Sequence, residues 1–222
     1  MRPAPRAVVG ALLALTFTTG VVDAVCFLGL GRVFTANMTG NVVLLGFGLA
    51  GTDGLPVLAP LVSLAAFACG AAVGGVAIRR QPEGKVGPAL LGAALVGEAA
   101  LAGIAALVAA TTDVHAGTVV AGVVIALLAS AMGLRNAIVR KLAVAELTTT
   151  VLTMTVTGLA ADGPAAAKAH VRRLSALVAM LLGALVGALL VKHTLWVPLA
   201  LVACAAVGLS VLVTRRAAAA AA

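Results

Sequence analysis

The chain has 222 residues, of which 63% are hydrophobic and 10% are charged, and its mean hydropathy is +1.20. Apolar runs recur along its whole length, which excludes an ordinary soluble domain and predicts a polytopic membrane protein. The net charge of +8 comes from Lys and Arg residues between the apolar runs, where such residues orient membrane helices. The composition therefore predicts a lipid bilayer around the chain and no nucleic-acid partner.

Six apolar runs are long enough to cross a bilayer. They cover residues 7–30, 58–78, 86–110, 117–139, 174–191 and 195–214. The longest polar stretch between apolar segments is residues 161–173, so a binding site has to lie within the membrane part. The sequence predicts an all-α fold with a single transmembrane domain over residues 1–222, which ends in a flexible tail at 215–222.

Two further apolar segments, residues 37–51 and 147–161, are too short to cross. At about 1.5 Å per residue, helices of this length cover about 21 Å of the roughly 30 Å hydrocarbon core. Their polar starts carry Asn37, Thr39, Gly40 and Asn41 in the first segment, and Thr148, Thr149 and Thr150 in the second. We expect two re-entrant half-helices whose polar starts lie near the bilayer midplane.

The distribution of Lys and Arg favours this arrangement. If neither short segment crosses, thirteen of the 15 Lys and Arg residues fall on one side, and only Arg32 and Lys192 fall on the other. If both short segments cross, the split is eight to seven. Basic residues collect on the cytoplasmic side, so the re-entrant arrangement is favoured and both termini are expected in the cytoplasm.

The two halves of the chain resemble each other. Gly20-Val-Val-Asp23-Ala24 returns 113 positions later as Gly133-Leu-Arg-Asn136-Ala137, and Gly70-Ala-Ala-Val-Gly74 returns at the same offset as Gly183-Ala-Leu-Val-Gly187. Each half holds three crossings, an odd number, so the second half enters the membrane upside down. The sequence predicts inverted repeats over about residues 7–110 and 117–214, the plan of many transporters and channels.

The half-helix starts predict a site for a solute. Free N–H groups and positive helix ends favour an anionic or strongly hydrogen-bonding group, so we assign substrate binding to the seven residues at the two starts. Asp23 and Glu98 lie inside predicted crossings, where an unpaired carboxylate is costly. Together with Asn136, the repeat counterpart of Asp23, they are candidates for coupling to a proton or cation. An ion pair with Arg135 is the structural alternative for Asp23.

Nothing in the sequence indicates catalysis. It contains no Ser/His/Asp set, no HExxH motif and no paired metal ligands, so we expect neither an enzyme nor a cofactor or metal site. The three cysteines, Cys26, Cys69 and Cys204, fall inside apolar runs, which is typical of small packing residues.

Several blocks resemble a known family. They are Gly20-Val-Val-Asp23-Ala24, Phe34-Thr-Ala-Asn-Met-Thr-Gly-Asn41, Met132-Gly-Leu-Arg-Asn136 and Leu147-Thr-Thr-Thr150. They are similar to the YoaK family of bacterial inner-membrane proteins, which was long catalogued as a domain of unknown function and is described by similarity as small-molecule transporters. The resemblance implies a multi-pass protein of the bacterial plasma membrane that moves a small-molecule solute, and it names no substrate.

Three functions stay open at this point. The first is a secondary transporter of a small polar or anionic solute, coupled to a proton or cation through Asp23. The second is a facilitative channel through the same cavity, and the third is a membrane scaffold that transports nothing. The sequence also leaves open whether the chain forms a homo-oligomer.

Overall fold

A computed structural model describes residues 6–52, 54–82, 86–142, 152–162 and 167–221. Within these residues the chain forms eight α-helices and no strand. The helices are α1 (Arg6–Gly29), α2 (Met38–Leu49), α3 (Leu58–Arg79), α4 (Pro88–Thr111), α5 (Val119–Lys141), α6 (Leu152–Ala161), α7 (Ala167–Val191) and α8 (Trp196–Ala221). All but α2 and α6 are long and apolar enough to cross a membrane. The predicted all-α class and the six long apolar helices are confirmed.

The helix ends follow local chemistry. The Asn37 side chain accepts a hydrogen bond from the Gly40 N–H at the start of α2, and Thr118 does the same for Ala121 at the start of α5. The helix α8 continues to Ala221, whereas the sequence predicted a flexible tail from residue 215. Alanine has the highest helix propensity of all residues, so the final alanine run extends the helix.

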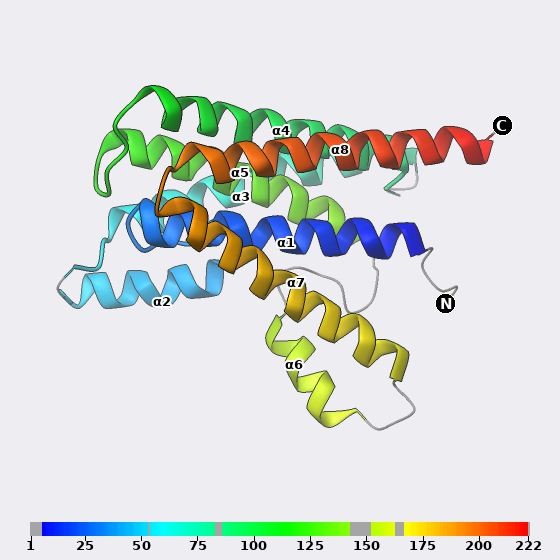
Figure 1. Ribbon diagram of the computed structural model, residues 1–222, viewed down its shortest axis with the longest axis horizontal. Helices are drawn as coiled ribbons and strands as arrows, with labels where there is room; N and C mark the ends of the chain where they lie inside the picture. The colour runs from blue at the N-terminus through cyan, green and yellow to red at the C-terminus, as the bar shows by residue number, and fades with distance from the viewer. Residues whose placement is uncertain (1–5, 53, 83–85, 143–151, 163–166, 222) are drawn as a thin grey trace.

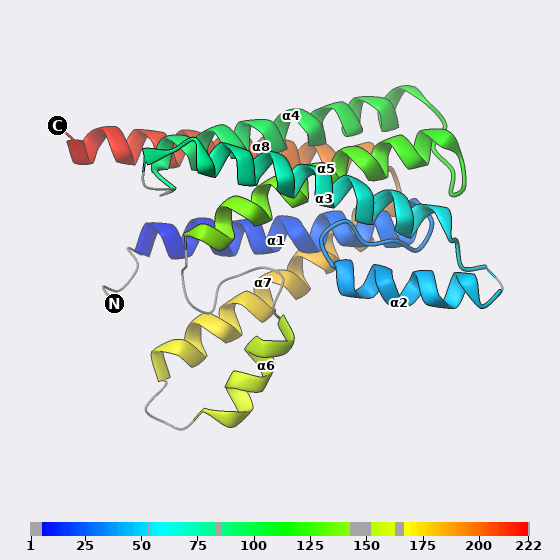
Figure 2. The ribbon, with the colours of Figure 1, turned by 180° about the vertical axis from the view of Figure 1, so that it is seen from behind.

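The six long helices form one bundle with α1 near its middle (Figures 1 and 2). The helices α4 and α8 lie side by side along one face, α3 packs against α5, and α7 packs against α1. The start of α1 and the end of α8 lie at the same end of the bundle (Figure 1). The arrangement therefore pairs helices that are far apart in the sequence.

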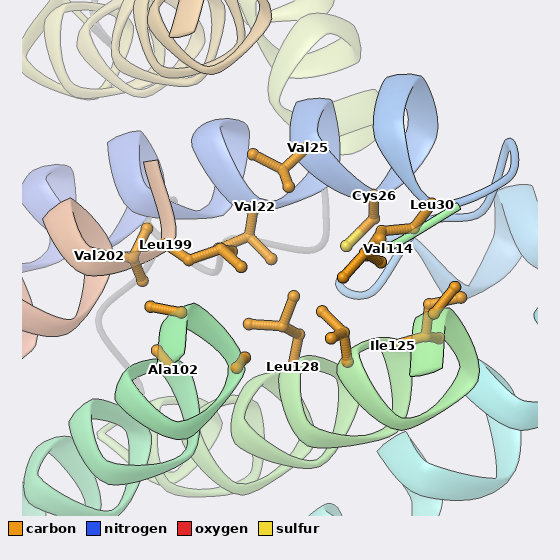
Figure 3. Packing of buried hydrophobic residues seen from close by; sticks show 14 of the residues in the cluster. Val22, Val25, Cys26, Leu30, Ala102, Val114, Ile125, Leu128, Leu199 and Val202 are labelled. Atoms are coloured by element: carbon orange, nitrogen blue, oxygen red, sulfur yellow. The ribbon is translucent and has the colours of Figure 1, made fainter. Parts of the chain in front are cut away.

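The core lies where α1, α4, α5 and α8 meet. Figure 3 shows Val22 and Cys26 of α1 facing Leu128 of α5, with Ala102 of α4 and Leu199 of α8 closing the side. These five side chains are fully buried. By contrast, large apolar residues along α7 are exposed, as expected for a helix that faces lipid on its outer side.

Glycines let two pairs of helices approach closely. A Cβ added to Gly70 of α3 would collide with the carbonyl oxygen of Ser130 in α5, and one added to Gly183 of α7 would collide with the carbonyl oxygen of Phe17 in α1. Only glycine fits at such positions, as in other small-residue helix contacts in membranes.

These contacts recur at the spacing seen in the sequence. Gly70 and Gly183 are 113 residues apart, and so are their partners Phe17 and Ser130. A second set of contacts obeys the same rule: Gly133 approaches the Phe67 carbonyl, Gly20 approaches the Met180 carbonyl, Gly74 approaches Leu134 and Ala137, and Gly187 approaches Val21 and Ala24. The pair α3 with α5 thus matches the pair α1 with α7, contact by contact.

The two short helices differ from the rest in length and position. At about 1.5 Å per residue, α2 is about 18 Å long and α6 about 15 Å, well short of a hydrocarbon core. In Figures 1 and 2, α2 begins part of the way along α1 and ends near the point where α3 begins. The helix α6 lies against the first half of α7, at the edge of the bundle.

The close approach of α5 to α3 leads to a test with two substitutions in the same helix. We expect Gly133→Ala to lower the free energy of unfolding by about 1–3 kcal/mol, because the added methyl group meets the Phe67 carbonyl. Gly122→Ala is the control, since nothing lies within 4 Å of an added Cβ there. It should stabilise by up to about 1 kcal/mol through helix propensity. Unfolding in detergent measures both, and equal effects would contradict the packing described.

Candidate functional site

The segment between α1 and α2 is held by Asp23. Its Oδ1 atom accepts hydrogen bonds from the backbone N–H groups of Thr35 and Ala36, both at 3.0 Å. Asp23 lies in α1, one helical turn after Thr19, and only 5% of its surface is exposed. A buried backbone outside a helix has to find acceptors within the protein, and this carboxylate oxygen supplies one for two donors.

A second clamp holds the same segment from α2. The Asn41 Oδ1 atom accepts from the Phe34 N–H at 2.9 Å, and its Nδ2 atom donates to the Phe34 carbonyl at 2.6 Å and to Ser63 Oγ at 3.1 Å. Ser63 of α3 donates to the same carbonyl at 2.6 Å. Asn41 is fully buried, so its amide group fixes the start of α2 against α3. The described contacts make it a positioning residue.

A buried ion pair lies deeper in the bundle. Arg135 Nη1 of α5 donates to Glu98 Oε1 of α4 at 2.8 Å, and the two side chains are 2% and 1% exposed. Arg135 also donates to the hydroxyl oxygens of Thr18 and Thr19 in α1. These hydroxyl groups in turn donate to the Leu15 carbonyl. One guanidinium group therefore ties together three helices.

This ion pair changes two of the sequence-based interpretations. Arg135 was counted among the basic residues at one face of the membrane, but it is buried in the bundle. Its carboxylate partner is Glu98, whereas the structural alternative for Asp23 paired Asp23 with Arg135. The guanidinium is within hydrogen-bonding distance of four groups, one of them the Met132 sulfur. Pairing and hydrogen bonding of this kind are what a charge in an apolar interior requires, although Arg135 Nε and Glu98 Oε2 find no partner among the described residues.

A cavity of about 1300 Å³ opens beside Asp23. Its walls come from α1, the start of α2, α3, α5, α6 and α7, which are parts of both sequence halves. The polar lining residues are Thr19, Asp23, Asn37, Thr39, Asn136, Arg140, Lys141 and Thr153. Apolar side chains, including Phe34 and Phe67, form most of the remaining wall. The volume exceeds the usual range of small-molecule sites, about 300–1,000 Å³.

The structure brings together many of the predicted site residues. Asn37, Thr39 and Gly40 of the first short segment line the cavity with Asp23 and Asn136. Asn41 and Glu98 are buried and are not among the lining residues. Thr148, Thr149 and Thr150 fall outside the described residues. Among the residues that the structure does describe, no three His, Cys, Asp or Glu side chains gather as metal ligands would.

Some lining residues escaped the sequence reading. Phe34 and Phe67 lie in apolar stretches, where an aromatic residue facing a cavity looks the same as one facing lipid. The sequence-based assignment also lacks Thr19, although three threonines, at positions 16, 18 and 19, interrupt the first apolar stretch. The signal in the sequence that could have identified Thr19 is its position one helical turn before Asp23.

Six long apolar helices around a polar interior define a polytopic α-helical membrane protein. The chain belongs to a family catalogued as protein of unknown function (DUF1275), whose model matches residues 11–213. The UPF0700 transmembrane protein YoaK of Bacillus subtilis (strain 168) is 48% identical over 59 residues, which is 27% of this chain and 26% of that relative. The resemblance to YoaK is thereby confirmed, over about a quarter of its length. No solved structure matches the chain.

The buried ion pair predicts a large difference between two acid-to-amide substitutions. We expect Glu98→Gln to cost about 3–5 kcal/mol of unfolding free energy, because it leaves the Arg135 charge buried without a counter-charge. Asp162→Asn is the matched control, since Asp162 pairs with Arg173 at a side-chain exposure of 46%. It should cost about 0–1 kcal/mol.

Thermal and denaturant unfolding of the purified protein in detergent compares the two variants. A double variant, Glu98→Met with Arg135→Met, should be more stable than Glu98→Gln alone, because it removes both charges. Similar losses for Glu98→Gln and Asp162→Asn would mean that the buried pair contributes no more than the exposed one.

Proposed function

We propose that this protein is a secondary transporter that moves a small polar solute across the bacterial plasma membrane, rather than an enzyme. The observation that carries the proposal is the cavity of about 1300 Å³, which is built from both halves of the chain and holds a carboxylate near its inner end. Polar groups and irregular backbone inside a membrane protein mark solute or ion pathways.

The glycine contacts support an inverted-repeat plan. Close packing of α3 on α5 repeats that of α1 on α7 at a constant offset of 113 residues. In Figure 1, α1 and α5 run in opposite directions along the bundle, and so do α4 and α8. Transporters with such repeats expose a central site by rocking one group of helices against another. The two glycine-lined interfaces are the natural surfaces for that movement.

The short helices support the re-entrant interpretation. Both α2 and α6 are too short to cross, and residues from both contribute to the cavity. The start of α2 contributes Asn37, Thr39 and Gly40 to the wall. A helix start near mid-depth is how many transporters present polar backbone to a solute.

The charges support an orientation with both termini in the cytoplasm. Exposed basic residues mark the ends of α3, α5 and α8, namely Arg79, Arg80, Arg140, Lys141, Arg215 and Arg216. The ends of α3 and α8 lie at the same end of the bundle as the start of α1 (Figure 1). By the positive-inside rule this end faces the cytoplasm, and the cavity then opens toward it past Arg140 and Lys141.

Asp23 is the proposed coupling residue. It is buried, lines the cavity and contacts the segment that precedes α2. Binding or release of a proton or cation at this carboxylate would therefore act directly on the backbone at the start of a half-helix. Such a link between an ion and a moving element is what coupled transport needs.

Thiol accessibility tests the proposal. In a background without native cysteines, Thr39→Cys should react with a charged, membrane-impermeant thiol reagent, because Thr39 lines the cavity. Val96→Cys is the control: Val96 is exposed on α4 outside the cavity and should face lipid, where a thiol stays unreactive. Labelling is measured in intact cells and in inside-out vesicles.

The sidedness of labelling separates the functions. A transporter predicts that Asp23→Asn changes access to Thr39→Cys in opposite directions from the two sides. A channel predicts equal access from both sides, with no such exchange. If Thr39→Cys is as unreactive as Val96→Cys in both preparations, the cavity is closed to water and transport through it is refuted.

A further inference from the structure

The buried part of the cavity lining carries negative rather than positive charge. Asp23 is buried, whereas the two basic lining residues, Arg140 and Lys141, are exposed. Asp23 Oδ1 accepts two backbone hydrogen bonds, and the Thr35 side chain also interacts with the carboxylate. The side chain is buried and yet lines the cavity. The carboxylate is therefore within reach of a group inside the cavity.

Several backbone N–H groups around the start of α2 already have acceptors within the protein. The N–H groups of Thr35 and Ala36 bind Asp23, the Phe34 N–H binds Asn41, and the Gly40 N–H binds the Asn37 side chain at 3.2 Å. An anionic solute at this place would compete with Asp23 and be repelled by its charge. The Asp23 carboxylate therefore disfavours an anion beside these N–H groups.

The basic groups near the cavity are either paired with an acid or exposed. Arg135 attracts the Asp23 carboxylate electrostatically, but its guanidinium pairs with Glu98 and does not line the cavity. The remaining ionisable side chains among the described lining residues are Arg140 and Lys141, in the last turn of α5. Both are exposed. At physiological ionic strength, salt largely screens the interaction of exposed charges with groups more than about 8 Å away.

The walls next to Asp23 suit an apolar body with a positive charge. Phe34 and Phe67 line the cavity, together with Met38, Met180 and several aliphatic side chains. Aromatic faces attract cations, more strongly where water is scarce. Organic ammonium groups are recognised in many proteins by this combination of aromatic rings and a carboxylate.

We propose that the cavity binds a small organic ammonium, whose nitrogen lies at Asp23 and whose apolar body packs against Phe34 and Phe67. This inference rests on the proposed transport function and narrows its solute. It replaces the expectation of an anionic solute, which came from the helix starts alone, with a cationic one. The ammonium group would contact the Asp23 carboxylate from the cavity.

Calorimetric titration of the purified full chain in lipid nanodiscs tests this selectivity with three probes of similar size. Benzyltrimethylammonium carries the cation, benzoate an anion and benzyl alcohol neither. We expect the ammonium to bind at least tenfold more tightly than the other two. Tighter binding of benzoate, or equal binding of all three, would overturn the proposal.

Two variants locate the binding. Asp23→Asn keeps an oxygen that can accept from Thr35 and Ala36, so the fold should persist while ammonium affinity falls at least tenfold. Asp113→Asn, in the exposed loop after α4, is the matched control and should leave affinity unchanged. If Asp23→Asn does not fold, Phe67→Leu takes its place, and it should lower ammonium affinity at least threefold without affecting benzyl alcohol.

The rim charges give an opposite expectation for the two kinds of solute. Replacing both Arg140 and Lys141 by Gln should leave ammonium affinity unchanged or raise it, whereas an anion site would lose affinity. The assignment would be overturned if this variant lost ammonium binding. It would also be overturned if neither Asp23→Asn nor Phe67→Leu changed the ammonium affinity. Reactive Thr39→Cys without ammonium binding would refute this inference alone, whereas an unreactive Thr39→Cys would refute transport.

Discussion

Buried backbone N–H groups outside a helix need acceptors from the protein, and most strictly so in a membrane, where hydrocarbon offers none. Here the segment before α2 depends on two side chains from the helices on either side of it, α1 and α2. Asp23 accepts from Thr35 and Ala36, and Asn41 accepts from Phe34. These contacts determine where α2 begins, and with it one wall of the cavity. The site is thus organised by polar satisfaction rather than by apolar packing.

The surrounding frame combines close packing with one buried charge. Glycines bring α3 onto α5 and α1 onto α7 at equivalent positions 113 residues apart. Arg135 then links α5 to α4 through Glu98 and to α1 through two threonine hydroxyl groups. The residue equivalent to Arg135 in the first half, 113 positions earlier, is Val22, so this charge has no counterpart there. The packing is therefore repeated in the two halves, whereas the polar interior is not.

This contrast bears on mechanism. In the transport mechanism that we propose, the repeated frame provides two similar interfaces along which helices could shift, and the asymmetric interior provides one charged side chain for a solute. The carboxylate of Asp23 belongs to the first half, Asn136 holds the equivalent position in the second, and both residues line the cavity. A cationic group would find a charge on one side and an amide on the other. The six long apolar helices establish the membrane class, and the lining of the cavity is the basis for the proposed solute.

Composition and apolar periodicity determined the class, the six long helices and the short helix after residue 37, because helices in lipid need long apolar runs whatever their neighbours. The recurrence at 113 residues also identified the glycines that touch in the fold, since close contact admits no side chain. Which acid paired with Arg135, and that Asn41 clamps the backbone while Asp23 faces the cavity, was decided by tertiary structure alone. Those choices depend on the distances between side chains of different helices, and the spacing of residues along one chain carries no measure of them.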